Sequence, residues 1–323
     1  MSLESLQGNR TLDILYKAEQ GGYGVLAQVC YDAQSVIALV RSAERMASPA
    51  MIMLFPVTLA YGKGPFLQFC LSIAHQAAVP IAVHLDHATD PEHLELALSL
   101  AEKGITFDSI MVDASHAETD EENIALARPY IDRARKYGIA VEVELGRLEG
   151  GEAGLRMISD AKLTNQKNAD MFMKGTGAVI LAPSIGNLHG SYLKPPNFRQ
   201  DIIQNLRTTF KGRGIPLCLH GTDELPDELF RECIASGMSK FNINSWARDP
   251  YLKTFTSALQ VGRPLPDAIE EATEMFATPP PGFSQSSLKV NVLNVHRLST
   301  LSNPQLLHTH TSNLVTGDQA NQL

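Results

Sequence analysis

The sequence predicts an α/β protein of the (β/α)8 class, a TIM barrel. Short apolar, β-branched runs recur along most of the chain, and each is followed by a longer segment with helical spacing. Successive runs start roughly 25 to 40 residues apart, about the length of one strand, one helix and two loops in a βαβ unit. Eight such runs stand at residues 23–31, 49–55, 79–86, 107–114, 139–145, 177–184, 215–220 and 240–245. Eight βα units are the content of one closed parallel barrel.

The segments between the runs have an apolar face and a polar face, as barrel helices should. The clearest are residues 33–46, 90–104 and 119–138. Asp90 and Thr119 stand where N-caps are expected, and Gly104 and Gly138 stand where a helix prefers to end. An open doubly wound sheet is the alternative that the same local pattern permits. The barrel is favoured because no Gly-rich dinucleotide loop follows the first run.

Composition and charge narrow the classes of function. The 323 residues are 44% hydrophobic and 19% charged, which is typical of a globular protein. The net charge of −8 comes without a Lys/Arg cluster, which argues against nucleic acid or a membrane as partner but allows a phosphorylated small molecule. No signal sequence opens the chain, and no apolar run is long enough to cross a bilayer, so we expect a cytoplasmic protein. Four cysteines without metal-type spacing predict buried free thiols.

The chain changes character near its end, which divides it in two. Residues 1–277 carry the predicted barrel. Residues 278–323 open with a run of prolines, are rich in Ser, Asn and Gln, and contain three charged residues, Lys289, Arg297 and Asp318. We expect this second part to be a weakly ordered C-terminal tail.

Polar and titratable side chains follow the third to eighth runs. The carboxyl ends of barrel strands share one rim, so residues far apart in the sequence meet there. Taken singly, each has an ordinary explanation as a hydrogen-bonded or turn residue. Three histidines from three strands, however, would form a three-nitrogen zinc site with one open position, as catalytic zinc sites do. The residues concerned include His84, Asp86, His87, Asp113, His116, Glu142, Glu144, His189, His220, Asp223, Asn242, Asn244 and Ser245.

Several of these stretches resemble one known family. The segments HLDH, DASH, ELGRLEGGEAG, GNLHG, LHG and NINS, in this order and spacing, are similar to the zinc-dependent class II fructose-bisphosphate (ketose-bisphosphate) aldolase family. The similarity runs from about Thr11 to about Ala277 and leaves out the tail. It implies a TIM barrel that cleaves a sugar phosphate, a Zn²⁺ cofactor with a monovalent cation as a further candidate, and a homodimer or homotetramer.

The resemblance also implies a set of metal ligands. The family's three zinc-binding histidines fall on His87, His189 and His220. Asp113 and Glu144 match carboxylates that hold an alternative metal position in some members. His84 is then not a ligand, and we expect it to support the site from behind.

Two further positions match the family's proton-transfer groups. Asp86 falls on the aspartate that exchanges a proton with the aldehyde oxygen, and Glu152 falls on the loop glutamate that removes a proton from the bound ketone. Aldol chemistry needs an electrophile, a base and a separate acid, and zinc with these two carboxylates would supply one each. The sixth strand offers Pro183 and Ser184 where a Schiff-base lysine would be needed, so a covalent imine is not expected.

The substrate contacts depart from the family pattern. Asp223 stands where the family has a small residue that contacts phosphate, and Gln28 and Val29 replace a Phe-Asn pair. A carboxylate against a phosphate is repulsive unless a cation lies between them. Two interpretations stay open: backbone amides and a monovalent cation still hold the phosphate, or the donor differs from dihydroxyacetone phosphate. The matching substrate-binding positions are Gly190, Gly221, Thr222, Asp223, Asn242, Asn244 and Ser245.

The favoured function is a zinc-dependent aldolase that reversibly cleaves a ketose phosphate such as fructose 1,6-bisphosphate or tagatose 1,6-bisphosphate. One alternative is an aldolase paralogue with another donor, and a second is a zinc-binding barrel without catalysis. Asp86 and Glu152 argue against the latter, because neither is needed merely to hold zinc. A hydrolase is less favoured, because no rim residue stands out as the group that would activate water.

Overall fold

A closed barrel of parallel strands forms the body of the computed structural model, which describes residues 3–150 and 159–276. The strand order around the barrel is β1-β10-β9-β7-β5-β4-β3-β2, and every pairing between neighbours is parallel. The predicted TIM barrel is therefore confirmed, and each of the eight predicted runs overlaps one of its strands. The strands are β1 Val25–Val29, β2 Ala50–Leu54, β3 Ile81–Ala88, β4 Ser109–Val112, β5 Ala140–Leu145, β7 Ile180–Pro183, β9 Leu217–Leu219 and β10 Met238–Ile243.

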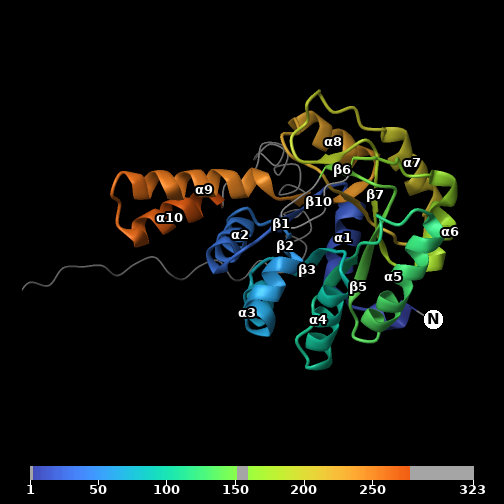
Figure 1. The fold of residues 1–323 in the computed structure, drawn as a ribbon, viewed down its shortest axis with the longest axis horizontal. Coiled ribbons are helices and arrows are strands. Elements are labelled where there is room, and N and C mark those ends of the chain that lie inside the picture. The colour runs from blue at the N-terminus through green and yellow to red at the C-terminus, as the bar shows by residue number, and fades with distance from the viewer. Residues whose placement is uncertain (1–2, 151–158, 277–323) are drawn as a thin grey trace, which may run out of the picture.

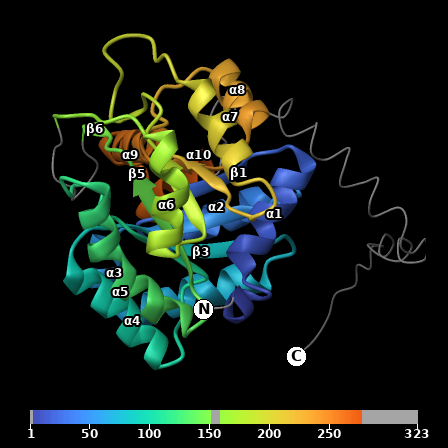
Figure 2. The same ribbon diagram turned by 90° about the vertical axis from the view of Figure 1, so that its right-hand side faces the viewer.

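Helices surround the barrel, and Figures 1 and 2 show α3, α4 and α5 side by side on its outside. The described helices are α1 Arg10–Gly21, α2 Ala33–Arg45, α3 Pro56–Gln76, α4 Pro91–Glu102, α5 Asp120–Arg135, α6 Gln166–Thr176, α7 Gln200–Thr209, α8 Asp227–Ser236, α9 Ser245–Gln260 and α10 Leu265–Phe276, with a short 3-10 turn at Leu3–Leu6. None of them is both long and apolar enough to span a membrane.

Three of the four expected helix-end residues have the predicted capping geometry. Thr119 caps α5, where its side chain accepts a hydrogen bond from the Glu122 amide at 3.1 Å. Asp90 occupies the N-cap position of α4, but its side chain makes no capping hydrogen bond. Gly104 and Gly138 both adopt positive φ, +81° and +71°, just beyond α4 and α5. Glycine adopts this left-handed conformation without a steric penalty, which is why it ends these helices.

Helix α1, which the sequence analysis did not identify, closes the amino-terminal end of the barrel. Its N-terminal end bonds to the chain at or just before three strands: the N-cap Asn9 donates to the carbonyls of Asp108 and Gly138 at 2.7 and 2.8 Å, and Arg10 donates to that of Ile81 at 2.6 Å. Leu15 on its buried face is fully covered, and burying such a side chain contributes about 1.5–3 kcal/mol. The opposite, carboxyl end of the barrel is therefore the open one.

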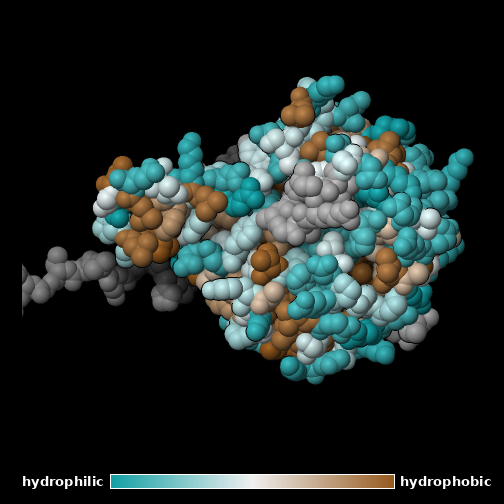
Figure 3. All heavy atoms as spheres, viewed as in Figure 1, coloured by the Kyte–Doolittle hydropathy of each residue, from teal (hydrophilic) through white to brown (hydrophobic). Residues whose placement is uncertain are grey.

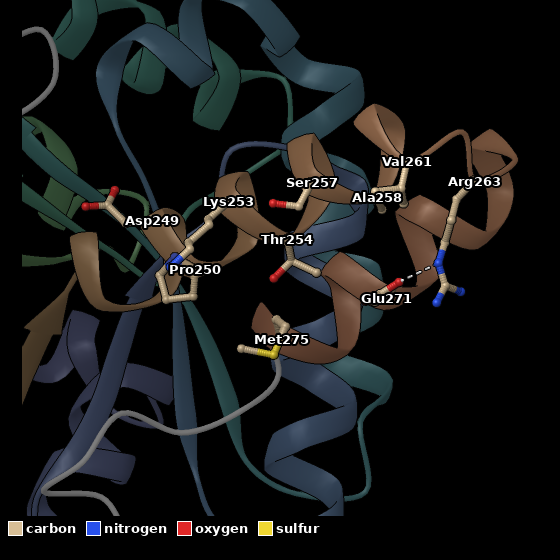
Figure 4. Close-up of a pocket in the computed structure, with 10 residues that line it drawn as sticks. All are labelled: Asp249, Pro250, Lys253, Thr254, Ser257, Ala258, Val261, Arg263, Glu271 and Met275. Carbon is tan, nitrogen blue, oxygen red and sulfur yellow. Dashed lines mark ion pairs between the residues drawn. The ribbon is translucent and has the colours of Figure 1, made fainter.

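The last two helices form a hairpin that projects from the barrel, with α10 folded back along α9 (Figure 1). An ion pair between Arg45 on α2 and Glu274 on α10, at 3.0 Å, ties the hairpin to the barrel helices. Figure 3 shows apolar side chains gathered on this hairpin. Figure 4 shows the cavity along it, where Arg263 and Glu271 form an ion pair at 3.4 Å. The cavity contains no residue of the predicted site.

A second, very short sheet lies at the carboxyl end of the barrel and was not predicted. It pairs β6, Glu149–Gly150, with β8, Leu188–His189, so that Gly150 stands beside His189. Gly150 has φ +95°, and a Cβ there would lie 1.9 Å from the carbonyl oxygen of His189. Only glycine fits this close approach. Glu152 and the predicted tail, residues 278–323, lie outside the described residues.

Candidate metal and catalytic site

The third strand delivers two adjacent site residues through an irregularity. The pairing of β3 with β4 shifts register between Leu85 and Ala88, and His87 between them has φ +41°. In a regular strand Asp86 and His87 would point to opposite faces. A bulge re-aims side chains, and here both residues are buried, each about 1% exposed. The positive φ of a non-glycine residue costs on the order of 1–3 kcal/mol and is characteristic of functional sites.

The three predicted metal ligands come together. His87, His189 and His220 each offer one ring nitrogen, and these atoms lie within 4.8 Å of one another. The ring centroid of His87 is 4.9 Å from that of His189 and 4.6 Å from that of His220. The closest approach joins His87 Nε2 and His220 Nδ1 at 2.9 Å. Three imidazoles gathered in this way offer the ligand set of a catalytic zinc.

In His87 and His220, the ring nitrogen that does not face the other histidine lies within hydrogen-bond distance of a carboxylate. Asp113 Oδ2 lies 2.8 Å from His87 Nδ1, and Glu142 Oε1 lies 2.9 Å from His220 Nε2. Histidines that bind metals commonly donate their second N–H to a carboxylate in this way, which fixes the ring and its tautomer. The structure therefore places Asp113 against a predicted ligand, as a hydrogen-bond partner.

Two buried polar atoms at this point lack a partner. His189 Nε2 and Glu144 Oε2 have no hydrogen bond to any described residue, and Glu144 Oε2 lies 3.9 Å from His220 Nδ1. Buried polar atoms are nearly always paired, so each orphan needs an explanation. A cation held by the histidines would satisfy an orphaned imidazole nitrogen and a carboxylate oxygen together. The residues present thus fit a zinc ion.

The surroundings shift the pKa values of these groups. Burial lowers the pKa of His189 well below its ordinary value. Burial acts on His87 in the same direction, but the negative charges of Asp86 and Asp113 outweigh it and raise the pKa of His87 to about 10. Burial, together with the charge of Asp113, raises the pKa of Glu144 to about 8. Protons therefore occupy the metal-free site at neutral pH, and a metal has to displace them.

The predicted catalytic aspartate lies beside the imidazoles. Asn242 on β10 donates from Nδ2 to Asp86 Oδ1 at 3.1 Å, and the same nitrogen is 3.2 Å from His220 Nε2. His84 does not belong to the cluster of His87, His189 and His220; its Nε2 is 3.9 Å from Asp86 Oδ1, and its Nδ1 lies 2.8 Å from Ser109 Oγ. A buried carboxylate held in one orientation is suited to proton transfer.

Lys240 was not identified from the sequence, and Glu142, which the sequence places among the polar strand-end residues, was given no role there. Lys240 is fully buried inside the barrel, and its Nζ lies 2.8 Å from Glu142 Oε2. Alternation along β10 puts Lys240 on the same face as Asn242, which is the signal that could have identified it. Burial alone would lower its pKa, but the facing Cys218 and Glu142 outweigh this and raise it. The amine is therefore held in its protonated form beside Glu142.

Several predicted substrate residues line one cavity of about 440 Å³. Asp223 in it is 7% exposed and accepts a hydrogen bond from Ser245 Oγ at 3.1 Å. Burial raises the pKa of Asp223. Three carboxylates and one guanidinium border the cavity, so it is acidic. The lining residues are Gly190, Ser191, Asp223, Glu224, Asn244, Ser245, Trp246, Arg248, Asp249 and Pro250.

Two other predicted substrate-binding residues, Thr222 and Gly221, are not among the residues that line the cavity. Thr222 donates to the backbone carbonyl of Asn242, which braces the turn after β9. Gly221 has φ +63°, and a Cβ there would lie 2.1 Å from the Leu188 carbonyl. These two residues therefore set the position of the loop that carries His220 and Asp223.

Comparison with known proteins agrees with this geometry. The family described as "Fructose-bisphosphate aldolase class-II" matches residues 9–281. A fructose-bisphosphate aldolase from Thermus caldophilus is 36% identical over 229 residues, 70% of this chain and 72% of that one. The D-tagatose-1,6-bisphosphate aldolase subunit GatY from Klebsiella oxytoca is 33% identical over 233 residues, 72% of this chain and 79% of that one.

Comparison with solved structures also finds an aldolase-like protein with this fold. A crystal structure of a Coccidioides immitis protein superposes with a TM-score of 0.79 at 32% identity, and covers 91% of this chain and 99% of the other. The family match spans the whole described barrel, including the three clustered histidines. The chain is therefore an enzyme, a carbon–carbon lyase that belongs to the class II fructose-bisphosphate aldolase family.

Proposed function

We propose that this enzyme is a zinc-dependent aldolase that reversibly cleaves a ketose phosphate, such as fructose 1,6-bisphosphate or tagatose 1,6-bisphosphate, into dihydroxyacetone phosphate and an aldehyde. The observation that carries the proposal is the cluster of His87, His189 and His220 with Asp86 buried beside it. When bound there, zinc supplies a Lewis acid that polarises a carbonyl.

The residues of the chain supply the proton transfers in this proposal. Asp86 takes the proton from the hydroxyl of the departing aldehyde in cleavage and returns it in condensation. Its hydrogen bond from Asn242 keeps one carboxylate oxygen oriented while the other stays available. Glu152 remains the proposed base that exchanges the proton at the ketone carbon, on the strength of the sequence resemblance. Gly190, Asn244 and Ser245 would contact the substrate, because they line the cavity next to His189.

The decisive experiment compares Asp86→Asn with the wild-type enzyme on both activity and metal. The variant keeps the shape of the side chain and removes its ability to take a proton. General acid or base catalysis is worth about 10²–10⁴-fold, so kcat should fall by that factor while bound zinc stays at the wild-type level. Asp90→Asn, four residues further along the chain at the exposed start of α4, is the matched control. Wild-type turnover in Asp86→Asn would contradict the assignment.

The acidic cavity favours a second candidate, an aldolase with a different donor. Asp223, Glu224 and Asp249 face only Arg248 among the charged residues of the lining. A phosphate placed there meets more negative than positive charge. A donor whose end carries hydroxyl groups would instead offer hydrogen bonds to these carboxylates.

A substrate panel separates the two candidates: fructose 1,6-bisphosphate, tagatose 1,6-bisphosphate, a ketose 1-phosphate and an unphosphorylated ketose, each with and without chelator. The mass in solution is measured first, because the family resemblance leads us to expect a dimer or tetramer. Asp223→Asn should lower KM for a bisphosphate if phosphate occupies the cavity against this charge. If the donor is uncharged, the variant should raise KM for the unphosphorylated ketose and leave the bisphosphates uncleaved.

A further inference from the structure

A charged pair lies in the barrel interior directly behind the site. Lys240 and Glu142 are both fully buried, on β10 and β5, and bond to each other at 2.8 Å. A buried ion pair is weak evidence for stability, because desolvation offsets much of the attraction, and apolar residues of similar volume often serve as well. The contacts of each partner with the site indicate another role.

Lys240 determines how the amide of Asn242 is turned. Its Nζ lies 2.9 Å from Asn242 Oδ1. An ammonium group can only donate, so it must meet the amide oxygen, and the amide nitrogen must face the other way. That nitrogen is the one that donates to Asp86 Oδ1 at 3.1 Å. With the amide reversed, its oxygen would face the carboxylate of Asp86 and repel it.

Glu142 determines which nitrogen of His220 carries the proton. One carboxylate oxygen is held by Lys240, and the other lies 2.9 Å from His220 Nε2. A carboxylate can only accept, so the proton on Nε2 points to Glu142; the Asn242 amide nitrogen, 3.2 Å from the same Nε2, then cannot donate to it and directs its hydrogen to Asp86. Nδ1, the nitrogen 2.9 Å from His87 Nε2, is then left with a free lone pair toward the other histidines.

We propose that the Lys240–Glu142 pair is a positioning unit for the site, which turns the Asn242 amide toward Asp86 and selects the His220 tautomer whose Nδ1 faces the metal ligands. The part that concerns Asp86 rests on the proposed function. The part that concerns His220 needs only the metal site.

The main test replaces the pair by neutral side chains of similar shape, Lys240→Met with Glu142→Gln. This double variant leaves no unpaired buried charge. Zinc affinity, measured by competition with a chromophoric chelator, should fall about 10–100-fold, as it does when the partner of a metal-binding histidine is lost. At saturating zinc, kcat should fall about 10-fold or more, as expected for a misplaced catalytic group, while KM stays within about threefold.

The control removes a partly buried ion pair elsewhere, Arg207→Met with Glu19→Gln, which joins α7 to α1 away from the site. If loss of a charge pair acted only through stability, both double variants would change zinc affinity equally, and that result would overturn the proposal. A double variant with zinc affinity and kcat within about threefold of wild type would overturn it too.

The single variant Glu142→Gln tests the effect on the His220 tautomer even if the double variant does not fold. Long-range ¹⁵N–¹H spectra should show His220 with its proton on Nε2 in the wild-type protein and a mixture of both tautomers in the variant. An unchanged tautomer in the folded variant contradicts the proposal. A wild-type enzyme that cleaves none of the panel substrates would disprove the proposed function, yet zinc affinity and tautomer would still report on the pair.

Discussion

His87 Nε2 and His220 Nδ1 approach to 2.9 Å although 133 positions separate the residues in the sequence. Their strands, β3 and β9, are opposite each other in the barrel order, with three strands between them on either side. The two imidazoles therefore meet over the barrel axis. A carboxylate accepts a hydrogen bond from the other nitrogen of each ring. The two facing nitrogens, His87 Nε2 and His220 Nδ1, can therefore share one proton or bind one cation.

Asp113→Asn should weaken zinc binding without unfolding the protein. The variant keeps the size of the side chain but removes the charge that faces His87 Nδ1 at 2.8 Å. Loss of such a partner typically lowers metal affinity about 10–100-fold. Competition with a chromophoric zinc chelator measures this, with Asp132→Asn, the partner of Arg128 on α5, as control. Equal zinc affinity in Asp113→Asn and wild type would show that the Asp113–His87 contact does not contribute to metal binding.

Removal of zinc should lower the thermal stability of the protein. A ligand that binds only the folded state contributes about 2.7 kcal/mol at a free concentration 100 times its Kd, which corresponds to a Tm shift on the order of 5 °C. We expect EDTA to lower Tm by this amount and added Zn²⁺ to restore it, whereas Mg²⁺ should not. His189→Ala supplies the control, because its Tm should no longer respond to zinc. A wild-type Tm that ignores EDTA would argue against a resident metal.

Gly221→Ala should damage both stability and zinc binding. The new Cβ would lie 2.1 Å from the Leu188 carbonyl, so β8 and its His189 must move. Gly212→Ala is the matched control, since Gly212 also has positive φ, +77°, but nothing lies within 4 Å of the added carbon. That control carries only the conformational cost of about 1–2 kcal/mol. Urea unfolding and zinc titration of both variants check the difference, and equal behaviour would contradict it.

The four cysteines should be unreactive in the folded protein. All are free and buried, as expected from the sequence. Burial raises the pKa of Cys70 to about 12 and that of Cys233 to about 11, and raises those of Cys30 and Cys218 further above their ordinary value. The thiolate is the reactive form. An aromatic disulfide reagent at pH 8 should therefore modify none of them until guanidinium is added, when all four react.

The same thiols make stability fall at alkaline pH. In the unfolded chain the pKa of a thiol is near its ordinary value of 9.0, while the buried thiols keep their protons. Their contribution is fully present below that pH and is lost as the pH rises toward the folded-state values. Denaturant midpoints at pH 8, 9 and 10 should decrease in that order. Cys233→Ala should reduce the decrease, and an identical slope in that variant would refute the explanation.

The sequence was sufficient for the barrel and the histidine cluster because both follow from local patterns. Each strand is a short apolar run, and a parallel barrel brings all carboxyl ends to one rim whatever the details of packing. The cluster forms because each of its histidines, His87, His189 and His220, stands at or after the carboxyl end of a barrel strand. The resemblance to a known family then indicated which of the ten histidines to choose.

Other features depend on contacts that a local pattern does not reveal. The register shift in β3 that turns both Asp86 and His87 inward arises from pairing with β4, a neighbour across the sheet. The β6–β8 pair is only two residues long on each side, too short for a periodic signal. The sequence pattern does not predict the buried Lys240, because lysine is rarely fully buried unless it is paired, and its partner Glu142 is 98 positions away.

Closure of the barrel has a consequence for the order of folding. The final pairing joins β1 to β10, with Val25 opposite Lys240, 215 positions apart (240 minus 25). Contacts of such long range form late, because the chain must first lose the entropy of a large loop. The clustered histidines that follow opposite strands then meet only in the completed fold. Zinc should therefore slow unfolding and leave the rate of folding almost unchanged.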